Sequence, residues 1–379
     1  MKRKLNKKKI TILIIAVLII ISTIVFTILY RKNIHVRNFF DEYIFRKNIT
    51  ENTLPNIYND NYSVYCFNDT IVTLDKNLLT FYNKSAEKAS SLDIEISNPI
   101  FKANGKYLCI AEKNGSKIYL IHDKDILWQK NIDGKISNLT LNENGYIALS
   151  ISDTTYTTIC KLYSNEGNEL FTTYLSTSYI MDSAISDDNK FLALAEANFS
   201  KVATQSNIKI ISIDNAVSNS ANSVVYNHSA PSDSLIVNID YCSNDNLVCI
   251  YDSHIDIIKN NSAEKISNIE TSNSLFADIN DKLIQIIKVD SGVFSNNFEL
   301  QIISSSTLEK TIYNLDKEPK SIDVFGNIIA INLGTEVLFI NNNAWLIKHY
   351  TASQEIHSVI LSNNLAGIVF KDKIEFLSL

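Results

Sequence analysis

The sequence predicts an all-β protein, an eight-bladed β-propeller, behind one transmembrane α-helix. Two observations predict this architecture. Residues 10–30 form an unbroken run without a charged side chain. From Tyr62 to the last residue, short runs rich in β-branched and aromatic residues alternate with polar turns, and the runs fall into groups of four. A four-stranded unit repeated at intervals of roughly 35 to 55 residues is typical of propeller blades.

Residues 10–30 are long enough to cross a membrane as a helix. Twenty-one helical residues span about 31 Å, against about 30 Å for the hydrocarbon core of a bilayer. A cleaved signal peptide has a shorter apolar region of about 7 to 15 residues and a small-residue cleavage site. The run here is longer and continues Ile28-Leu-Tyr-Arg-Lys32 without such a site. We therefore expect an uncleaved signal anchor embedded in membrane lipid.

Basic residues flank this run unequally. Six lie within the first nine residues, and three lie just beyond the run, at Arg31, Lys32 and Arg37. Because flanks rich in Lys and Arg stay on the cytoplasmic side, the N-terminus is expected in the cytoplasm. At the plasma membrane, the predicted organisation is a basic cytoplasmic tail (1–9), a transmembrane signal-anchor helix (10–30), a juxtamembrane helical stalk (31–55) and an extracytoplasmic propeller (56–379).

The stalk carries one apolar helical face. Val36, Phe39, Phe40 and Tyr43 recur at the i, i+3, i+4, i+7 spacing of such a face. We expect this face to pack on the propeller itself. A partner helix or the lipid surface are the alternatives.

The blades can be placed along the chain. The last stretch, residues 357–379, supplies only three runs, and a fourth is expected from the segment before Tyr62, which would close an eighth blade by joining the chain ends. Seven blades is the alternative. Turns such as Asn104-Gly105 hold the residues that tolerate a left-handed backbone. Seven complete groups begin near Ser63, Pro99, Lys135, Tyr179, Ser234, Ser274 and Lys320.

Three aromatic residues occupy the same slot, at the start of a fourth run: Trp128, Phe171 in Gly167-Asn-Glu-Leu-Phe171, and Trp345. This slot resembles the Gly-x-x-x-Trp docking position of quinoprotein-like (pyrroloquinoline-quinone-type) propeller repeats, although only the Phe171 copy has the glycine. With the N-terminal anchor, the chain resembles an uncharacterised, domain-of-unknown-function family of membrane-anchored bacterial propellers over residues 60–379. The resemblance implies that these aromatic side chains pack between blades.

The charge distribution excludes one class of partner. Eleven of the 35 Lys and Arg residues lie in the first fifty positions, so the remainder of the chain, with most of the 41 Asp and Glu residues, is strongly acidic. Nucleic-acid binding depends on basic residues that neutralise phosphates. We therefore expect no nucleic-acid partner. The five cysteines are predicted to be buried thiols. Cys242 and Cys249 are the only near pair, and their oxidation state is left open.

No catalytic constellation is recognisable. Quinoprotein dehydrogenases usually have a cysteine pair beside the cofactor and acidic calcium ligands, which this sequence lacks. The six histidines are dispersed, and Asp252 and Asp256 are interpreted as solvated residues. We therefore predict no catalytic residue, no cofactor, no metal and no enzymatic activity. Acids or histidines clustered at the propeller axis would favour the alternative, a quinoprotein-like envelope enzyme or cofactor-binding protein.

Loop aromatics are the candidate partner-binding residues. Hairpins between the second and third runs open on one face of a propeller, and the long ones carry Tyr156, Phe199, Phe294 and Phe298. The alternative is that these side chains fold onto their own blades. The sequence predicts a non-enzymatic binding, scaffold or sensor module at the cell envelope, with an envelope protein or a cell-wall glycan as its partner.

Overall fold

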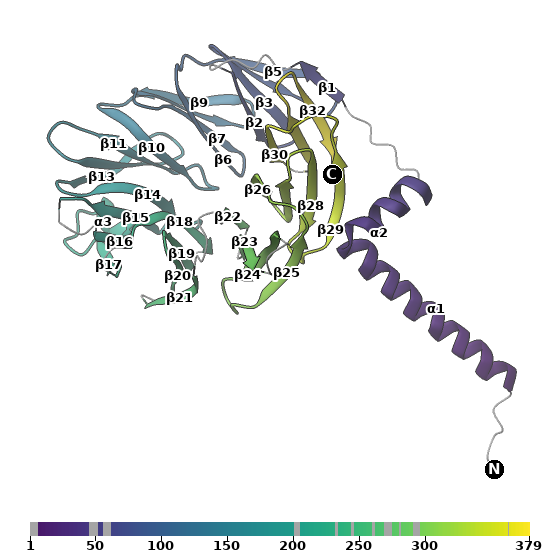
Figure 1. Ribbon diagram of the computed structural model, residues 1–379. Coiled ribbons are helices and arrows are strands. Elements are labelled where there is room, and N and C mark those ends of the chain that lie inside the picture. Colours follow the sequence, from purple (N-terminus) through teal and green to yellow (C-terminus); the bar gives the residue numbers. More distant parts are fainter. Residues whose placement is uncertain are drawn as a thin grey trace.

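The computed structural model describes residues 7–44, 52–55, 62–200, 205–231, 234–243, 246–259, 262–268, 275–279, 282–290, 296–362 and 364–379. Within them, the strands form eight four-stranded antiparallel sheets. The sheets are arranged as blades around a central axis, with α1 projecting from the edge of the ring (Figure 1). The expected eight-bladed, all-β propeller is confirmed.

In blades one to seven the strands follow their order in the chain from the axis outward, and in blade eight the outermost strand is β1. Blades one to four contain β2 (Tyr62–Phe67), β3 (Thr70–Asp75), β4 (Leu78–Tyr82), β5 (Lys88–Asp93); β6 (Pro99–Asn104), β7 (Tyr107–Glu112), β8 (Lys117–His122), β9 (Asp125–Asn131); β10 (Lys135–Leu141), β11 (Ile147–Ser152), β12 (Thr158–Tyr163), β13 (Glu169–Leu175); β14 (Tyr179–Ile185), β15 (Phe191–Asn198), β16 (Gln205–Ser212), the short helix α3 (Ile213–Val217) and β17 (Val224–Ser229).

The second half of the ring repeats this pattern. Blades five to eight contain β18 (Ile236–Ser243), β19 (Asn246–Tyr251), β20 (His254–Lys259), β21 (Ser262–Asn268); β22 (Leu275–Ile279), β23 (Lys282–Asp290), β24 (Asn296–Ser304), β25 (Lys310–Leu315); β26 (Ser321–Phe325), β27 (Ile328–Asn332), β28 (Glu336–Asn341), β29 (Leu346–Thr351); β30 (Ser358–Ser362), β31 (Leu365–Val369), β32 (Lys373–Ser378) and β1 (Asn52–Pro55).

The two ends of the chain close the ring in blade eight. Strand β1 pairs antiparallel with β32, in the register Asn52↔Phe376 to Pro55↔Lys373, and the two strands lie side by side in Figure 1. Around the axis, the first strand of every blade contacts the first strand of the next, including β30 with β2. The propeller therefore begins at Asn52, slightly before the boundary predicted from the sequence.

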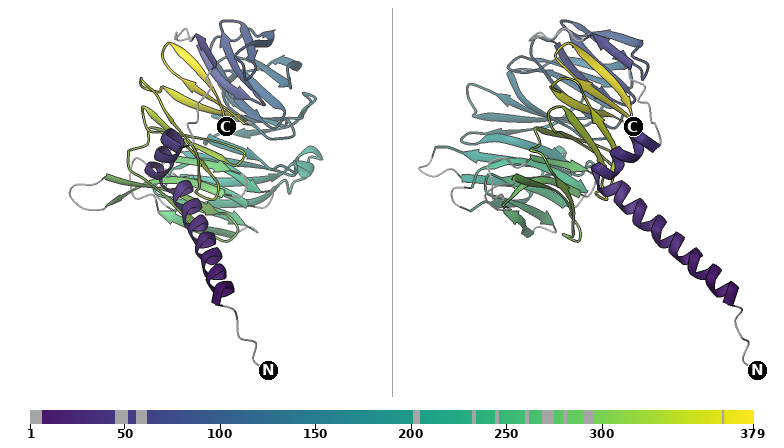
Figure 2. Two further views of the ribbon diagram at one scale, coloured as in Figure 1. Left: turned by 90° about the vertical axis from the view of Figure 1, so that its right-hand side faces the viewer. Right: turned by 45° about the vertical axis from the view of Figure 1, so that its right-hand side comes forward.

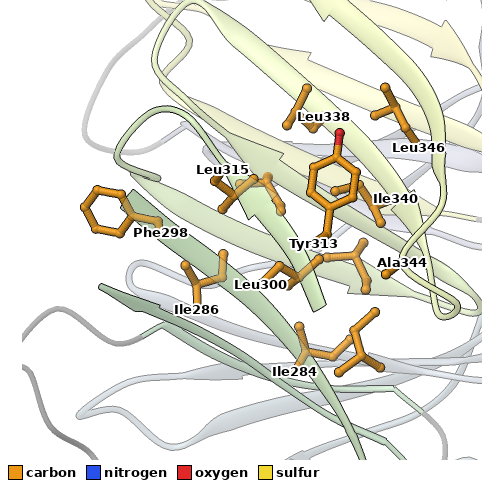
Figure 3. Packing of buried hydrophobic residues seen from close by; sticks show 13 residues of the cluster. Ile284, Ile286, Phe298, Leu300, Tyr313, Leu315, Leu338, Ile340, Ala344 and Leu346 are labelled. Carbon is orange, nitrogen blue, oxygen red and sulfur yellow. The ribbon is translucent and has the colours of Figure 1, made fainter. Parts of the chain in front are cut away.

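The core lies between blades. Middle strands are buried on both faces, as in β31, where every residue is buried, whereas outer strands such as β9 are largely exposed. Between blades six and seven, Ile284, Leu300 and Tyr313 pack against Leu338 and Ile340 (Figure 3). Two faces of each middle strand are thus covered by neighbouring blades, which explains continuous apolar runs in place of simple alternation.

The N-terminal helix α1 (Lys7–Lys32) leads into a short hooked stalk. Its segment Ile12–Lys32 is long and apolar enough to cross a membrane, and α1 extends away from the propeller (Figure 2). Asn33 caps the next helix, α2 (Ile34–Phe39), by accepting a hydrogen bond from the N–H of Val36 at 3.1 Å. A single π-helical turn, Phe40–Ile44, follows. The cap lets the chain turn sharply at the end of α1.

The stalk packs on the propeller through outer strand β29. Ile34 contacts the core between blades six and seven. Arg37 is buried, donates to the carbonyl oxygen of Leu346 on β29 and pairs with Asp41 at 3.2 Å. His349 on β29 lies 2.7 Å from Oδ1 of Asn38. The stalk thus docks on its own domain, largely through polar contacts.

The residues of the apolar face of the stalk have different surroundings. Phe40 turns back onto Phe26 of α1, with ring centroids 4.7 Å apart, and Val36 is half-buried. Phe39 is 54% exposed, and the side chain of Tyr43 lies outside the described residues. Among the described side chains of this face, Phe39 packs edge-on against Phe40 and still keeps about half of its surface exposed.

The three aromatic residues predicted at the start of a fourth strand, Trp128, Phe171 and Trp345, also differ in their packing. The indole N–H of Trp128 in blade two donates to the carbonyl of Asn165 in blade three, at 2.9 Å. Phe171 packs into the core between blades three and four. Trp345 is 38% exposed, and the Arg31 guanidinium lies over its ring. Inter-blade packing is confirmed for the first two and wrong for Trp345, whose neighbour is the stalk.

Candidate interaction face and axial pocket

One face of the propeller collects the longer loops. In every blade, the hairpin between the second and third strands opens on the same side as the connection to the next blade, because successive antiparallel strands reverse direction. On blades three and four this side carries the β11–β12 loop, the β15–β16 loop and the connection from β13 to β14. Four aromatic residues lie on these segments or in the strand ends beside them.

We call these residues, Tyr156, Tyr174, Tyr179 and Phe199, the aromatic face. They form two pairs: the ring centroids of Tyr156 and Tyr174 are 4.7 Å apart, and those of Tyr179 and Phe199 are 5.9 Å apart. Tyr174, Tyr179 and Phe199 are 55%, 51% and 49% exposed. Exposed aromatic side chains that hold one another in place can give a partner large contact area with little loss of conformational entropy.

Local hydrogen bonds fix the β11–β12 loop of the aromatic face. The carboxylate of Asp153 accepts from the N–H groups of Thr155 and Tyr156, at 2.8 and 3.2 Å, and these bonds lower the pKa of that carboxyl. The hydroxyl of Thr157 donates to the carbonyl of Ser176 at 2.8 Å, tying this loop to the connection between the blades. The Tyr156–Tyr174 pair is therefore set on a loop with defined shape.

The four predicted partner-binding residues differ in how far the structure exposes them. Phe199 is exposed, and Tyr156 is half-buried against the core between blades two and three. Phe298 is 3% exposed and belongs to the core between blades six and seven (Figure 3), so it presents no surface to a partner. Phe294 lies outside the described residues.

Sequence reasoning missed Tyr174 and Tyr179. Both stand in strands, at the end of β13 and at the start of β14, whereas the aromatic residues predicted from the sequence are all assigned to loops. The signal that would have found them is their position beside the short connection between two blades, on the side where the long hairpins open.

The axis holds a second candidate, an acid-lined pocket of about 400 Å³. Its walls come from the first strands of blades two to five and the turns beside them, including Lys102, Glu143, Asp182, Asp187 and Asp240. Acids do gather at the axis, which is the outcome that favours a cofactor-binding alternative.

Contacts show what some of these acids do. Asp182 accepts hydrogen bonds from the Asn238 side chain and the Ile239 N–H, at 2.7 and 3.1 Å, and so links blade four to blade five. Burial raises the pKa of Asp182, and it raises that of Asp240 to about 6. On the opposite side of the ring, Asp323 accepts from the Leu361 N–H at 2.7 Å and links blades seven and eight. Bridging between blades accounts for Asp182 and Asp323.

The described residues contain no group of three or more His, Cys, Asp and Glu side chains arranged to hold a metal ion. The five cysteines, including Cys242 and Cys249, are thiols and form no disulfide within the described residues. Burial raises the pKa of the Cys160 thiol to about 12, so at neutral pH it is a protonated, unreactive group.

Residues 41–379 match one family model, described as a family of unknown function (DUF5711). The chain belongs to this family. No curated protein matches it.

Solved structures share the fold at very low sequence identity. BamB from Moraxella catarrhalis is 8% identical with a TM-score of 0.51, covering 88% of this chain and 99% of that one. Chaetomium thermophilum Sqt1, bound to the N-terminus of the ribosomal protein L10, is 9% identical with a TM-score of 0.54, covering 84% and 97%. The dihydro-heme d1 dehydrogenase NirN is 10% identical with a TM-score of 0.53, covering 86% and 72%. These likenesses concern the propeller fold alone.

Proposed function

We propose that this member of the family is a membrane-anchored, extracytoplasmic and non-enzymatic binding or scaffold protein, which holds an envelope protein against its aromatic face. The observation that carries the proposal is the exposure of Tyr174, Tyr179 and Phe199 on the same side of two adjacent blades. Such surfaces are typical of protein contacts. A cell-wall glycan is the alternative occupant, because sugar rings also stack on aromatic side chains.

The N-terminal segment supplies the proposed location. The basic tail and the apolar helix anchor the chain in membrane lipid with the N-terminus in the cytoplasm, and the propeller faces the outside. The hooked stalk fixes the propeller to the end of the span through β29. The propeller would therefore hold its partner at a defined distance from the membrane.

Site-specific photo-crosslinking in intact cells tests the binding proposal. A photoreactive phenylalanine analogue replaces Tyr179 or Phe199 in the full chain, and the matched control replaces Phe325. Phe325 is also an exposed aromatic residue, 40% accessible, but it lies at a hairpin between first and second strands, on the opposite side of the propeller. One defined polypeptide adduct at positions 179 and 199, absent at 325, is the expected result.

Other outcomes separate the alternatives. Equal adducts at all three positions, or none at 179 and 199, would contradict the protein partner. Co-sedimentation with purified cell wall that is lost in a Tyr179→Ala, Phe199→Ala double variant, without any protein adduct, would assign the face to a glycan.

The axial acids favour a second candidate, a cofactor-binding protein of quinoprotein type. Glu143 and Asp240 line the pocket and keep solvent-accessible surface there, although the surrounding protein desolvates the Asp240 carboxyl. A cation or a polar cofactor in the pocket could therefore reach both side chains. Thermal unfolding of the full chain with calcium or a quinone tests this candidate. Stabilisation that disappears in Asp240→Asn would support it, and unfolding unchanged by either additive would exclude these ligands.

A further inference from the structure

A second cavity, of about 620 Å³, lies between the outer parts of blades four and five. Its wall includes His228 from β17, Ser253 and His254 from the start of the β20 hairpin, Asp256 from β20 and Lys265 from β21. The β19–β20 hairpin joins second and third strands, and His228 stands just before the connection to blade five. The cavity therefore opens on the same side of the propeller as the aromatic face, and its size suits a small ligand or a side chain.

Asp256 is the unusual residue of this cavity. The sequence suggests a solvated acid, yet the side chain is only 8% exposed. Its Oδ1 atom is buried and has no hydrogen-bond partner within the described part of the chain. Its other oxygen, Oδ2, lies 3.5 Å from Nε2 of His254, which is longer than an ordinary hydrogen bond. A buried carboxylate that is this poorly satisfied is rare in folded proteins.

Among the described residues, only His254 lies within ion-pairing distance of this carboxylate, at 3.5 Å, and it compensates the charge only when it is protonated. Lys265 is the cross-strand neighbour of Asp256 in the ladder between β20 and β21, but it is exposed and makes no ion pair with it. On the other side, Asp256 faces Cys249 of β19, a buried thiol. Because a buried charge is strongly disfavoured without a full counter-ion or hydrogen-bond donors, a cation in the cavity that Asp256 lines would stabilise this carboxylate.

The surrounding rings suit an organic cation. His254 stacks on Tyr251, with centroids 4.4 Å apart and planes 8° apart, and His228 lies parallel to Tyr226 at 6.3 Å. The stacking on Tyr251 holds the His254 imidazole beside the carboxylate, and His228 lines the same cavity. We propose that the cavity binds an organic cation, an alkylammonium or guanidinium group, with Asp256 as its counter-ion. The cation belongs either to a free small molecule or to a basic side chain of a bound polypeptide.

Two other chemistries fit less well. A metal site would need three converging ligands, and among the described residues no such group exists. Ser253, His254 and Asp256 have the residue types of a hydrolase triad, with Ser253 Oγ 2.9 Å from His254 Nδ1. In a working triad, however, the carboxylate accepts a hydrogen bond from the imidazole, and 3.5 Å is too long for that bond.

Titration of the full-length protein in detergent tests the proposal. The probe is n-butylguanidinium, and n-butylurea is its neutral isostere. We expect only the cation to bind, and Asp256→Asn to weaken its affinity roughly 10- to 100-fold, because the charge-assisted hydrogen bond is lost. Lys265→Met should leave the affinity unchanged or raise it. Equal binding of cation and urea, unchanged binding to Asp256→Asn, or loss of binding in Lys265→Met would each overturn the proposal.

A measurement on the unmodified chain guards against a variant that does not fold. Histidine-selective NMR should show the probe shifting the signals of His228 and His254, while that of His122 in blade two stays constant; equal shifts at all three would contradict the site.

Tighter binding of acetyl-Gly-Arg-Gly-amide than of n-butylguanidinium would assign the cavity to a polypeptide side chain, and weaker binding to a free cation. This inference rests on the cavity alone and stands or falls independently of the aromatic face.

Discussion

The indole N–H of Trp128 donates a hydrogen bond to the carbonyl of Asn165, 2.9 Å away in the next blade. The same indole covers Gly167, so closely that a Cβ added there would lie 3.0 Å from the ring. A tryptophan in one blade thus fixes the position of a glycine turn in the next. The contact is made at the outer part of the propeller, where blades diverge and have fewer other neighbours.

Gly167→Ala should therefore destabilise the propeller more than Gly326→Ala does. Both glycines have positive φ angles, +82° and +60°, so both substitutions carry a backbone cost of about 1 to 2 kcal/mol. Only at Gly167 does the new methyl group meet the indole, which adds about 1 to 3 kcal/mol through overpacking. Nothing lies within 4 Å of the Cβ position at Gly326. Denaturant unfolding of both variants measures the difference, and equal losses would contradict the docking role of Trp128.

Arg37→Met should loosen the stalk from the propeller. The substitution keeps an apolar stem but removes the donors to the Leu346 carbonyl and to Asp41. We expect the free energy of local opening of α2 to fall by about 1.5 to 3 kcal/mol, the usual value for hydrogen bonds to a charged group. Hydrogen exchange of the amides in α2 measures this change.

Lys32→Met is the matched control for the stalk. Lys32 is also basic and lies five residues earlier, but it is exposed at the end of α1. Its replacement should leave exchange in α2 unchanged. Similar acceleration in both variants would mean that general charge, and not the buried contact of Arg37, holds the stalk.

The blades could be predicted because each inter-blade core imposes the same short apolar runs and polar turns on the chain. The wrong predictions of burial concern positions where a neighbouring element, and not the local sequence pattern, determines whether the side chain is buried. Asp256 alternates with Ile255 and Ile257 in β20, which suggests a solvent-facing residue, but the adjacent blade covers that side too. Phe298 follows two asparagines that resemble a turn, whereas β24 already begins at Asn296 and pairs Phe298 with Lys288.

Asp323→Asn should change how stability depends on pH. Burial raises the pKa of Asp323 to about 6 from an ordinary 3.8, although hydrogen bonds from the N–H groups of Leu361 and Val324 oppose the rise. Between these values the folded carboxyl keeps its proton and the unfolded one has lost it. The unfolded state then binds fewer protons, so the contribution of this group to stability falls as pH rises through this window.

From pH 4 to pH 7, wild-type stability should fall relative to that of Asp323→Asn by about 1 to 3 kcal/mol, since one pKa unit corresponds to about 1.4 kcal/mol. Denaturant unfolding at several pH values measures the two curves. Asp69→Asn, at an exposed turn in blade one, serves as the control and should run parallel to the wild type. Parallel curves for Asp323→Asn as well would show that this carboxyl titrates normally.

The chain's two tryptophans report its placement on the membrane. Arg31, in the last turn of the proposed span, lies 4.5 Å over the ring of Trp345, so this indole should sit at the bilayer interface, where tryptophan is favoured. Trp128 is held between blades two and three, away from the stalk. In vesicles of brominated lipid, Trp128→Phe, which retains only Trp345, should lose much of its fluorescence, and Trp345→Phe should lose little. Equal quenching in the two variants would contradict an anchor docked at β29, because only that arrangement brings one indole, and not the other, to the lipid.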